Sequence, residues 1–146
     1  MTAGKVLGVG LIAFLAYYFL KLKSTVENLS YRIAGAGLSF QGITPILRLD
    51  VKITNPDPTA FTIKSIVGDL YTNGKLVGTV EQVTPTVIAG NSQTIYKLYI
   101  RLSIIGIASD IVSIFNGNGI QQQLEFDGTV YIDNLTAPLQ LNYTLG

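Results

Sequence analysis

The chain has 146 residues, 48% hydrophobic and 13% charged, with a formal net charge of +1. This composition excludes a disordered chain, and the ten scattered basic residues give no clustered positive surface for a nucleic acid. Cys and His are both absent, which excludes disulfides, thiolate nucleophiles, the usual zinc sites and Ser–His or Cys–His dyads.

The first predicted element is an uncharged segment from Val6 to Leu20, which lies between Lys5 and Lys21. A helix over residues 2–22 would be about 31 Å long, enough to cross the hydrocarbon core of a bilayer if both lysines reach the headgroups. We therefore expect residues 1–23 to form a single-pass transmembrane anchor. The side chains expected to contact lipid are Val6, Leu7, Leu11, Ile12, Phe14, Leu15, Tyr17, Tyr18, Phe19 and Leu20.

Two other interpretations of this segment stay open. A cleaved signal peptide has a similarly short apolar core, but no small-x-small cleavage site directly follows Leu20. A buried core helix would have a polar face, and this segment has none. A retained anchor accounts best for the pattern and predicts location in a membrane, either a cellular membrane or the internal membrane of a virion.

Residues 24–30 are predicted to continue the helix as a short stalk. Leu22, Val26 and Leu29 are spaced four and three apart, so they form one apolar stripe on that helix. Such a stripe needs a partner. The partner is either the surface of the following domain or a neighbouring subunit.

From residue 31 to residue 146 the apolar period changes to two, which is typical of half-buried β-strands. The pair Asn73-Gly74 predicts a tight hairpin turn, because both positions of that turn need positive φ angles. Gly68, inside the first arm of this hairpin, predicts a β-bulge. The side chains expected to face inward are Leu47, Leu49, Val51, Ile53, Tyr96, Leu98, Ile100, Leu102, Leu124, Phe126, Val130, Ile132, Leu139, Leu141 and Tyr143.

About seven short antiparallel strands in this length are typical of an immunoglobulin-like or fibronectin-III-like sandwich of two packed sheets. One segment, residues 103–117, breaks the strand pattern. Its apolar residues are spaced three and four apart, with Ser103 as the expected N-cap and Gly117 just past the end, which predicts a short helix. An irregular connection between strands is the alternative.

The chain resembles a known family in this β region, from about Ile43 to Leu145. The resemblance is carried by Leu49-Asp50-Val51-Lys52-Ile53-Thr54-Asn55-Pro56, Phe61-Thr62-Ile63, Gly68-x-Leu70-Tyr71-x-Asn73-Gly74-Lys75 and Ile88-Ala89-Gly90-Asn91-Ser92. It is similar to the water-stress and hypersensitive-response (WHy) domain, the type 2 late-embryogenesis-abundant domain. The resemblance implies a seven-stranded sandwich with one helix, an association with desiccation or other stress, and frequent membrane attachment. It implies no catalytic residue.

The Asn-Pro step of the Asn-Pro-Asp-Pro segment is the best marker of this family in the chain. Pro56 and Pro58 fix φ and lack an N–H donor, so they should end the strand. Asn55 and Asp57 can accept hydrogen bonds from their own backbone and close a turn. A Ca²⁺ site is not expected, since the sequence has no D-x-D-x-D-G run and Asp57 stands alone in this turn.

No catalytic centre, metal site or cofactor site is expected. Glu125 and Asp127 lie on one outward strand face, where solvation is the ordinary explanation. The interface candidates are two outward tyrosines, Tyr99 and Tyr131, together with Pro56 and Pro58.

Three functions follow as hypotheses. The first is a non-catalytic, membrane-anchored structural or interaction protein that docks onto a protein partner or neighbouring subunits, for example as a virion component linking an outer shell to an internal membrane. The second is a stress-protective membrane-associated protein, as the resemblance implies. The third is a small-ligand or lipid carrier, which requires a pocket of a few hundred cubic ångströms.

Overall fold

The computed structural model describes residues 23, 25–103, 105–117, 119–133 and 135–146. The predicted membrane anchor, residues 1–23, lies outside these ranges except for Lys23. None of the helices within the described ranges combines the length and apolarity needed to cross a membrane.

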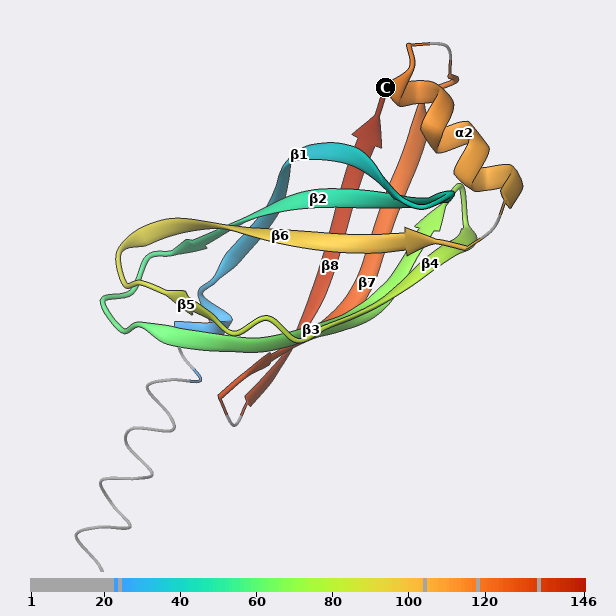
Figure 1. Ribbon diagram of the computed structural model, residues 1–146. Coiled ribbons are helices and arrows are strands. Elements are labelled where there is room, and N and C mark those ends of the chain that lie inside the picture. Colours follow the sequence, from blue (N-terminus) through green and yellow to red (C-terminus); the bar gives the residue numbers. More distant parts are fainter. Residues whose placement is uncertain (1–22, 24, 104, 118, 134) are drawn as a thin grey trace, which may run out of the picture.

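The fold is mainly antiparallel β structure with little helix, as the strand pattern predicts. Its elements are β1 (Ser30–Gln41), β2 (Thr44–Asn55), β3 (Phe61–Thr72), β4 (Lys75–Gln82), β5 (Thr86–Ile88), β6 (Ser92–Leu102), α2 (Ile105–Phe115), β7 (Gln122–Ile132) and β8 (Leu135–Leu145). Figure 1 shows these strands curling around a common interior, with α2 at one end of the sheet.

The strands that we expected to divide into two sheets are hydrogen-bonded into one. Their order is β1-β2-β6-β4-β3-β7-β8, and β5 pairs with β3 outside this path. The link in the middle is short, since β4 and β6 pair only at Gly78↔Leu102 and Thr79↔Arg101. Beyond this link β4 and β6 separate, which leaves one edge of β6 open.

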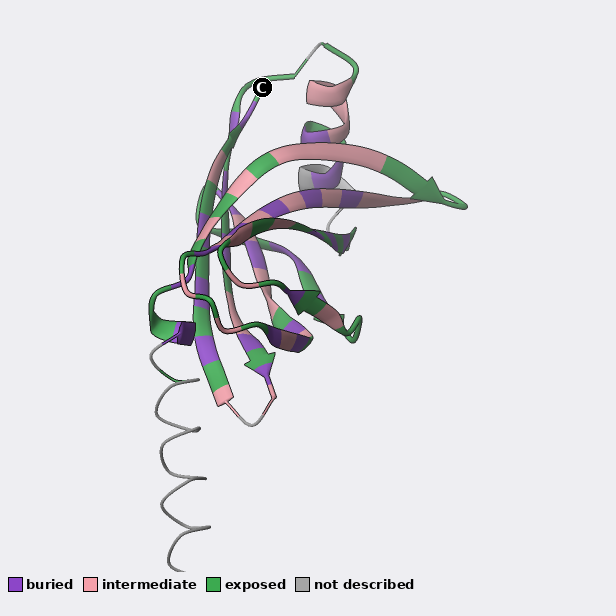
Figure 2. Cartoon of the chain, turned by 90° about the vertical axis from the view of Figure 1, so that its left-hand side faces the viewer, coloured by how far each residue is buried: buried purple, intermediate pink, exposed green. Residues whose placement is uncertain are grey.

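The core consists of the inward faces that the period-two pattern predicts. Leu47, Leu49, Val51 and Ile53 on β2 are fully buried, and the residues between them are half-buried. Figure 2 shows a similar alternation of buried and exposed positions along β6, β7 and β8. The predicted inward residues of β6, β7 and β8 are buried too, except that Tyr143 is half-buried against the core.

The hairpin between β3 and β4 confirms its predicted turn, with φ of 50° at Asn73 and 79° at Gly74. The bulge predicted at Gly68 is wrong. Gly68 pairs in register with Val80 on one side and Gly128 on the other. A Cβ atom at position 68 would lie 2.7 Å from the Cα of Gly128, so this glycine permits a close approach of two strands.

The predicted helix is present as α2, and Ala108 and Ile111 on it are buried in the core. Its end is closed as expected, because Gly117 has φ of 80° and its N–H donates to Ile114 O at 3.0 Å. Ser103 has a different role from the expected N-cap. Its hydroxyl and its backbone N–H both donate to Val77 O, at 3.3 and 3.0 Å, which ties the start of the helix to β4.

Residues 25–27 are helical and lead through a turn into β1. Val26 and Leu29, two members of the predicted apolar stripe, are 7% and 9% exposed and belong to the core of the domain. The domain itself is therefore a partner of this stripe. Figure 1 places residues 25–29 at the opposite end of the sheet from α2.

Candidate functional site

The Asn-Pro-Asp-Pro segment is held by the side chain of Asn55, the last residue of β2. This side chain is 1% exposed. Its Nδ2 donates to Thr59 O at 2.9 Å and to Ala89 O at 3.2 Å, and its Oδ1 accepts from the N–H of Asp57 at 3.1 Å. One amide thus joins the end of β2, the following loop and the turn before β6.

The turn before β6 packs closely on the same loop. Asn91 N–H donates to Asp57 O at 2.8 Å, and a Cβ atom at Gly90 would lie only 2.2 Å from Pro58 O. The carboxylate of Asp57 accepts a bond of 3.4 Å from Asn28 Nδ2. These contacts make the segment a structural junction, and its Asx turn between Asn55 and Asp57 is the turn that the sequence predicts.

Pro56 and Pro58, two of the interface candidates, are exposed on this junction. They lie where β2 ends, in agreement with their predicted effect on the strand. Within the part of the chain that the structure describes, no three His, Cys, Asp or Glu side chains gather where they could hold a metal ion.

An apolar pocket of about 620 Å³ lies between the N-terminal residues and the first half of β8. Residues 23 and 26–31 form one wall, and β8 forms the other. Most of its accessible surface is apolar. The lining residues are Lys23, Val26, Glu27, Leu29, Tyr31, Leu135, Thr136, Ala137, Pro138 and Gln140. We call this hollow the N-terminal pocket.

Tyr31, one of the residues that line the N-terminal pocket, carries a buried polar group. Its hydroxyl is buried and has no hydrogen-bond partner among the described residues. Burial disfavours the phenolate and raises the pKa of Tyr31 to about 12. The hydroxyl therefore stays protonated at neutral pH and can donate to an oxygen atom. At the rim, Lys23 and Glu27 form an exposed ion pair of 3.9 Å.

Residues 50–142 match the sequence model of the LEA_2 family, late embryogenesis abundant protein. The chain belongs to this family. No match was found among curated protein sequences.

Solved structures share the fold of this LEA_2 chain. A crystal structure from Archaeoglobus fulgidus is 16% identical and has a TM-score of 0.55, covering 79% of this chain and 91% of its own. A solution structure from Arabidopsis thaliana is 15% identical with a TM-score of 0.59, covering 79% of each chain. The solution structure of a late embryogenesis abundant protein is 12% identical with a TM-score of 0.57, covering 97% of this chain and 84% of its own. These likenesses concern the fold alone.

Tyr99 and Tyr131, the other interface candidates of this LEA_2 domain, are 49% and 41% exposed. They lie on β6 and β7, and β4 and β3 stand between those strands in the sheet. Neighbouring strands are about 4.8 Å apart, so the two side chains do not form one patch. Any interface at Tyr99 is therefore separate from one at Tyr131.

Sequence reasoning missed the N-terminal pocket. The stripe of Val26 and Leu29 was a usable signal, because it predicted a partner surface for residues 24–30. The opposite wall comes from residues 135–140, about a hundred residues later in the chain. No local pattern predicts that these two segments lie side by side.

Proposed function

We propose that this LEA_2 domain is a non-catalytic binding protein that accepts an acyl chain with a polar end in the N-terminal pocket. The observation that carries the proposal is an apolar hollow of about 620 Å³ whose lining includes Tyr31, a residue with a buried hydroxyl for which the described residues provide no partner. Small-molecule sites in proteins have this size, with a mainly apolar lining and a few polar groups.

The lining indicates the chemistry of the ligand. Val26, Leu29 and Ala137 provide apolar contact for a hydrocarbon chain. The Tyr31 hydroxyl, kept neutral by its raised pKa, is suited to donate to a carbonyl or carboxylate oxygen. Lys23 and Glu27 at the rim carry opposite charges and form an ion pair, so the polar end of the ligand is selected mainly by the Tyr31 hydroxyl.

The position of the pocket supports a role at a membrane. Lys23 lines it, and residues 1–23 are the segment that we propose as a single-pass anchor in a bilayer. A pocket that begins where such an anchor ends would open close to the lipid surface. This arrangement suits a stress-related, membrane-associated LEA_2 protein that protects or carries lipid.

Docking of a protein partner is the second candidate function, and one specific observation favours it: the open edge of β6. The narrower WHy assignment and the virion role stay predictions from the sequence.

Photo-crosslinking tests the pocket. The full-length chain is mixed with phosphatidylcholine vesicles that contain palmitic acid bearing a diazirine, irradiated, and digested for mass spectrometry. We expect labels on residues 25–31 and 135–140. Tyr31→Phe should reduce labelling about fivefold to tenfold, because it removes one hydrogen bond to the ligand.

A matched pair of variants provides the control. Gln140→Trp places a bulky ring at the pocket and should abolish labelling, whereas Asn142→Trp, on the same strand but outside the lining, should not. Labels spread evenly over the surface, or unaffected by Gln140→Trp, would rule out the pocket. Co-flotation of the chain with the vesicles tests the anchor separately.

A further inference from the structure

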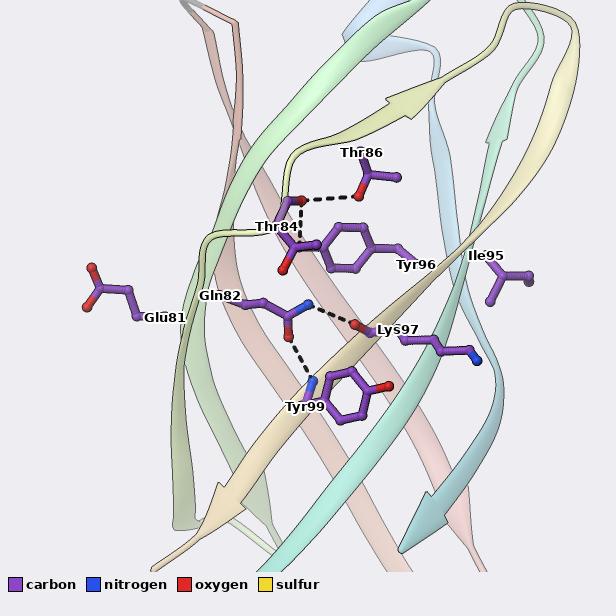
Figure 3. Close-up of a pocket in the computed structure, with 8 residues that line it drawn as sticks. All are labelled: Glu81, Gln82, Thr84, Thr86, Ile95, Tyr96, Lys97 and Tyr99. Carbon is purple, nitrogen blue, oxygen red and sulfur yellow. Dashed lines mark hydrogen bonds between the residues drawn. The ribbon is translucent and has the colours of Figure 1, made fainter. Parts of the chain in front are cut away.

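One edge of β6 presents backbone groups that no described strand pairs with. On its other side β6 pairs with β2 over residues 92–101. Towards β4 it pairs only through Arg101 and Leu102. The gap that opens beyond this link is a cleft of about 500 Å³ between residues 81–86 and residues 95–99. We call it the β4–β6 cleft, and Figure 3 shows the residues that line it.

A side chain takes the place of a strand inside the β4–β6 cleft. Gln82 Nε2 donates to Lys97 O at 2.8 Å, and Gln82 Oε1 accepts from Tyr99 N–H at 3.0 Å. Figure 3 shows this amide reaching from β4 to β6, with the Tyr96 ring directed across the cleft toward Thr84. A neighbouring strand would offer the same two kinds of group, one donor and one acceptor, to Lys97 and Tyr99.

The bonds to Gln82 also show which groups of β6 face the cleft. In an antiparallel strand the N–H and C=O of one residue point to the same side, and successive residues alternate. Because Lys97 O and Tyr99 N–H face the cleft, the N–H and C=O of Ile95 and the N–H of Lys97 face it too. These groups form an unpaired strand edge, and their spacing is suited to another peptide backbone.

Apolar side chains lie on the β6 side of the β4–β6 cleft. Ile95 and Tyr99 line it and are 48% and 49% exposed. The opposite wall is polar, formed by Glu81, Gln82, Thr84 and Thr86. Alternate side chains of a strand added to β6 would cover Ile95 and Tyr99.

We propose that the β4–β6 cleft binds a single extended segment of a partner protein, apolar at alternate positions, which adds to β6 as a strand. This function is separate from ligand binding in the N-terminal pocket. The segment displaces the Gln82 amide, whose two bonds lie at an exposed site, and replaces them with backbone bonds. Backbone pairing supplies affinity, and contact with Ile95 and Tyr99 supplies specificity.

The width of the β4–β6 cleft favours a lone extended segment over the edge of a folded sheet as the occupant. A sheet edge brings its own next strand about 4.8 Å away. That strand would collide with the opposite wall, residues 81–86, whose Gln82 side chain already reaches β6. A lone extended chain has no such neighbour, so the occupant is a segment that is unpaired before it binds.

Amide hydrogen exchange tests the proposal. The full-length chain, in a mild non-ionic detergent, is mixed with a pooled set of nonapeptides that alternate Val, Ile or Phe with Thr or Ser. We expect the amides of Ile95 and Lys97 to exchange at least tenfold more slowly, while Tyr96 and Leu98, which face β2, are unchanged. Gln82→Ala removes the internal competitor and should tighten binding about threefold to tenfold.

Two controls separate backbone pairing from simple apolar contact. The same peptides with N-methyl groups on alternate amides should give no protection. Ile95→Pro removes a cleft-facing donor without breaking the β2 ladder and should weaken binding at least tenfold, whereas Ile95→Thr should bind nearly as well. Failure of every pooled peptide, equal binding of the N-methylated set, or protection that rises with protein concentration alone would overturn the proposal.

Discussion

Two polar side chains near the same end of the sheet, Asn55 and Tyr31, differ in whether their buried polar atoms have hydrogen-bond partners. Asn55 forms three hydrogen bonds, to Thr59 O, Ala89 O and Asp57 N–H. The Tyr31 hydroxyl, on the neighbouring strand, has no partner among the described residues. Tyr31 pairs with Ile53 in the β1–β2 ladder, two residues before Asn55. Of these two neighbouring polar side chains, the described residues therefore give hydrogen-bond partners only to Asn55.

The contrast separates a structural site from a binding site. A buried polar group with all its bonds made inside the chain stabilises the fold and has no capacity left for a ligand. A buried donor without a partner costs about 1–3 kcal/mol, and a ligand oxygen removes that cost. We therefore assign Asn55 to the fold, and the proposed function uses the unpartnered hydroxyl of Tyr31.

The largest expected effect is the loss of the Asn55 amide. Asn55→Ala leaves one N–H and two carbonyls without their partner and should lower the free energy of unfolding by about 3 kcal/mol. Urea unfolding followed by circular dichroism measures this change. Asn142→Ala, at an exposed position of β8, should cost less than about 0.5 kcal/mol. A loss below about 1 kcal/mol for Asn55→Ala would remove the contrast with Tyr31.

Tyr31 should affect stability at high pH. Its folded pKa of about 12 lies above the ordinary value of 10, so the unfolded chain loses this proton first. The contribution of Tyr31 protonation to the free energy of unfolding is fully present below pH 10. It falls by about 2–3 kcal/mol as the pH rises toward 12. Tyr31→Phe removes this part of the pH dependence. Urea unfolding of both proteins at pH 9 and pH 11.5 measures the difference.

The same variant sharpens the assignment at neutral pH. Tyr31→Phe keeps the ring and removes the unpaired hydroxyl, so without ligand it should be as stable as the natural chain or about 1 kcal/mol more stable. A loss above 1 kcal/mol would show that the hydroxyl stabilises the fold as Asn55 does. Tyr96, whose pKa is also raised by burial, is present in both proteins and cancels in the comparison.

Local patterns predicted most of the fold. The alternation through Leu47 to Ile53 identified the buried face of β2, and Asn73-Gly74 identified the hairpin turn. The first prediction depends only on the direction of successive side chains, and the second depends only on two φ angles. The error at Gly68 has a different origin. A bulge and a close approach of two strands both favour glycine, and only the position of Gly128 distinguishes them.

The candidate sites depend on contacts that are distant in sequence. Asn55 bonds to Ala89, 34 residues later, and the N-terminal pocket joins residues 23 and 26–31 to residues 135–140. The β4–β6 cleft exists because the two strands separate after a short pairing. Periodicity shows which face of a strand is buried, but not which strand lies beside it.

The smallest expected effect concerns Asp57 and shows which part of the junction holds it together. The Asp57 carboxylate makes one exposed bond of 3.4 Å to Asn28, whereas its backbone N–H and C=O bond to Asn55 and Asn91. Asp57→Ala keeps both backbone bonds, so it should change the free energy of unfolding by less than about 0.5 kcal/mol. Urea unfolding beside Asn55→Ala measures both effects. A cost equal to that of Asn55→Ala would show that the Asp57 carboxylate stabilises the junction as much as the Asn55 amide does. The contrast between Asn55 and Tyr31 would then no longer hold.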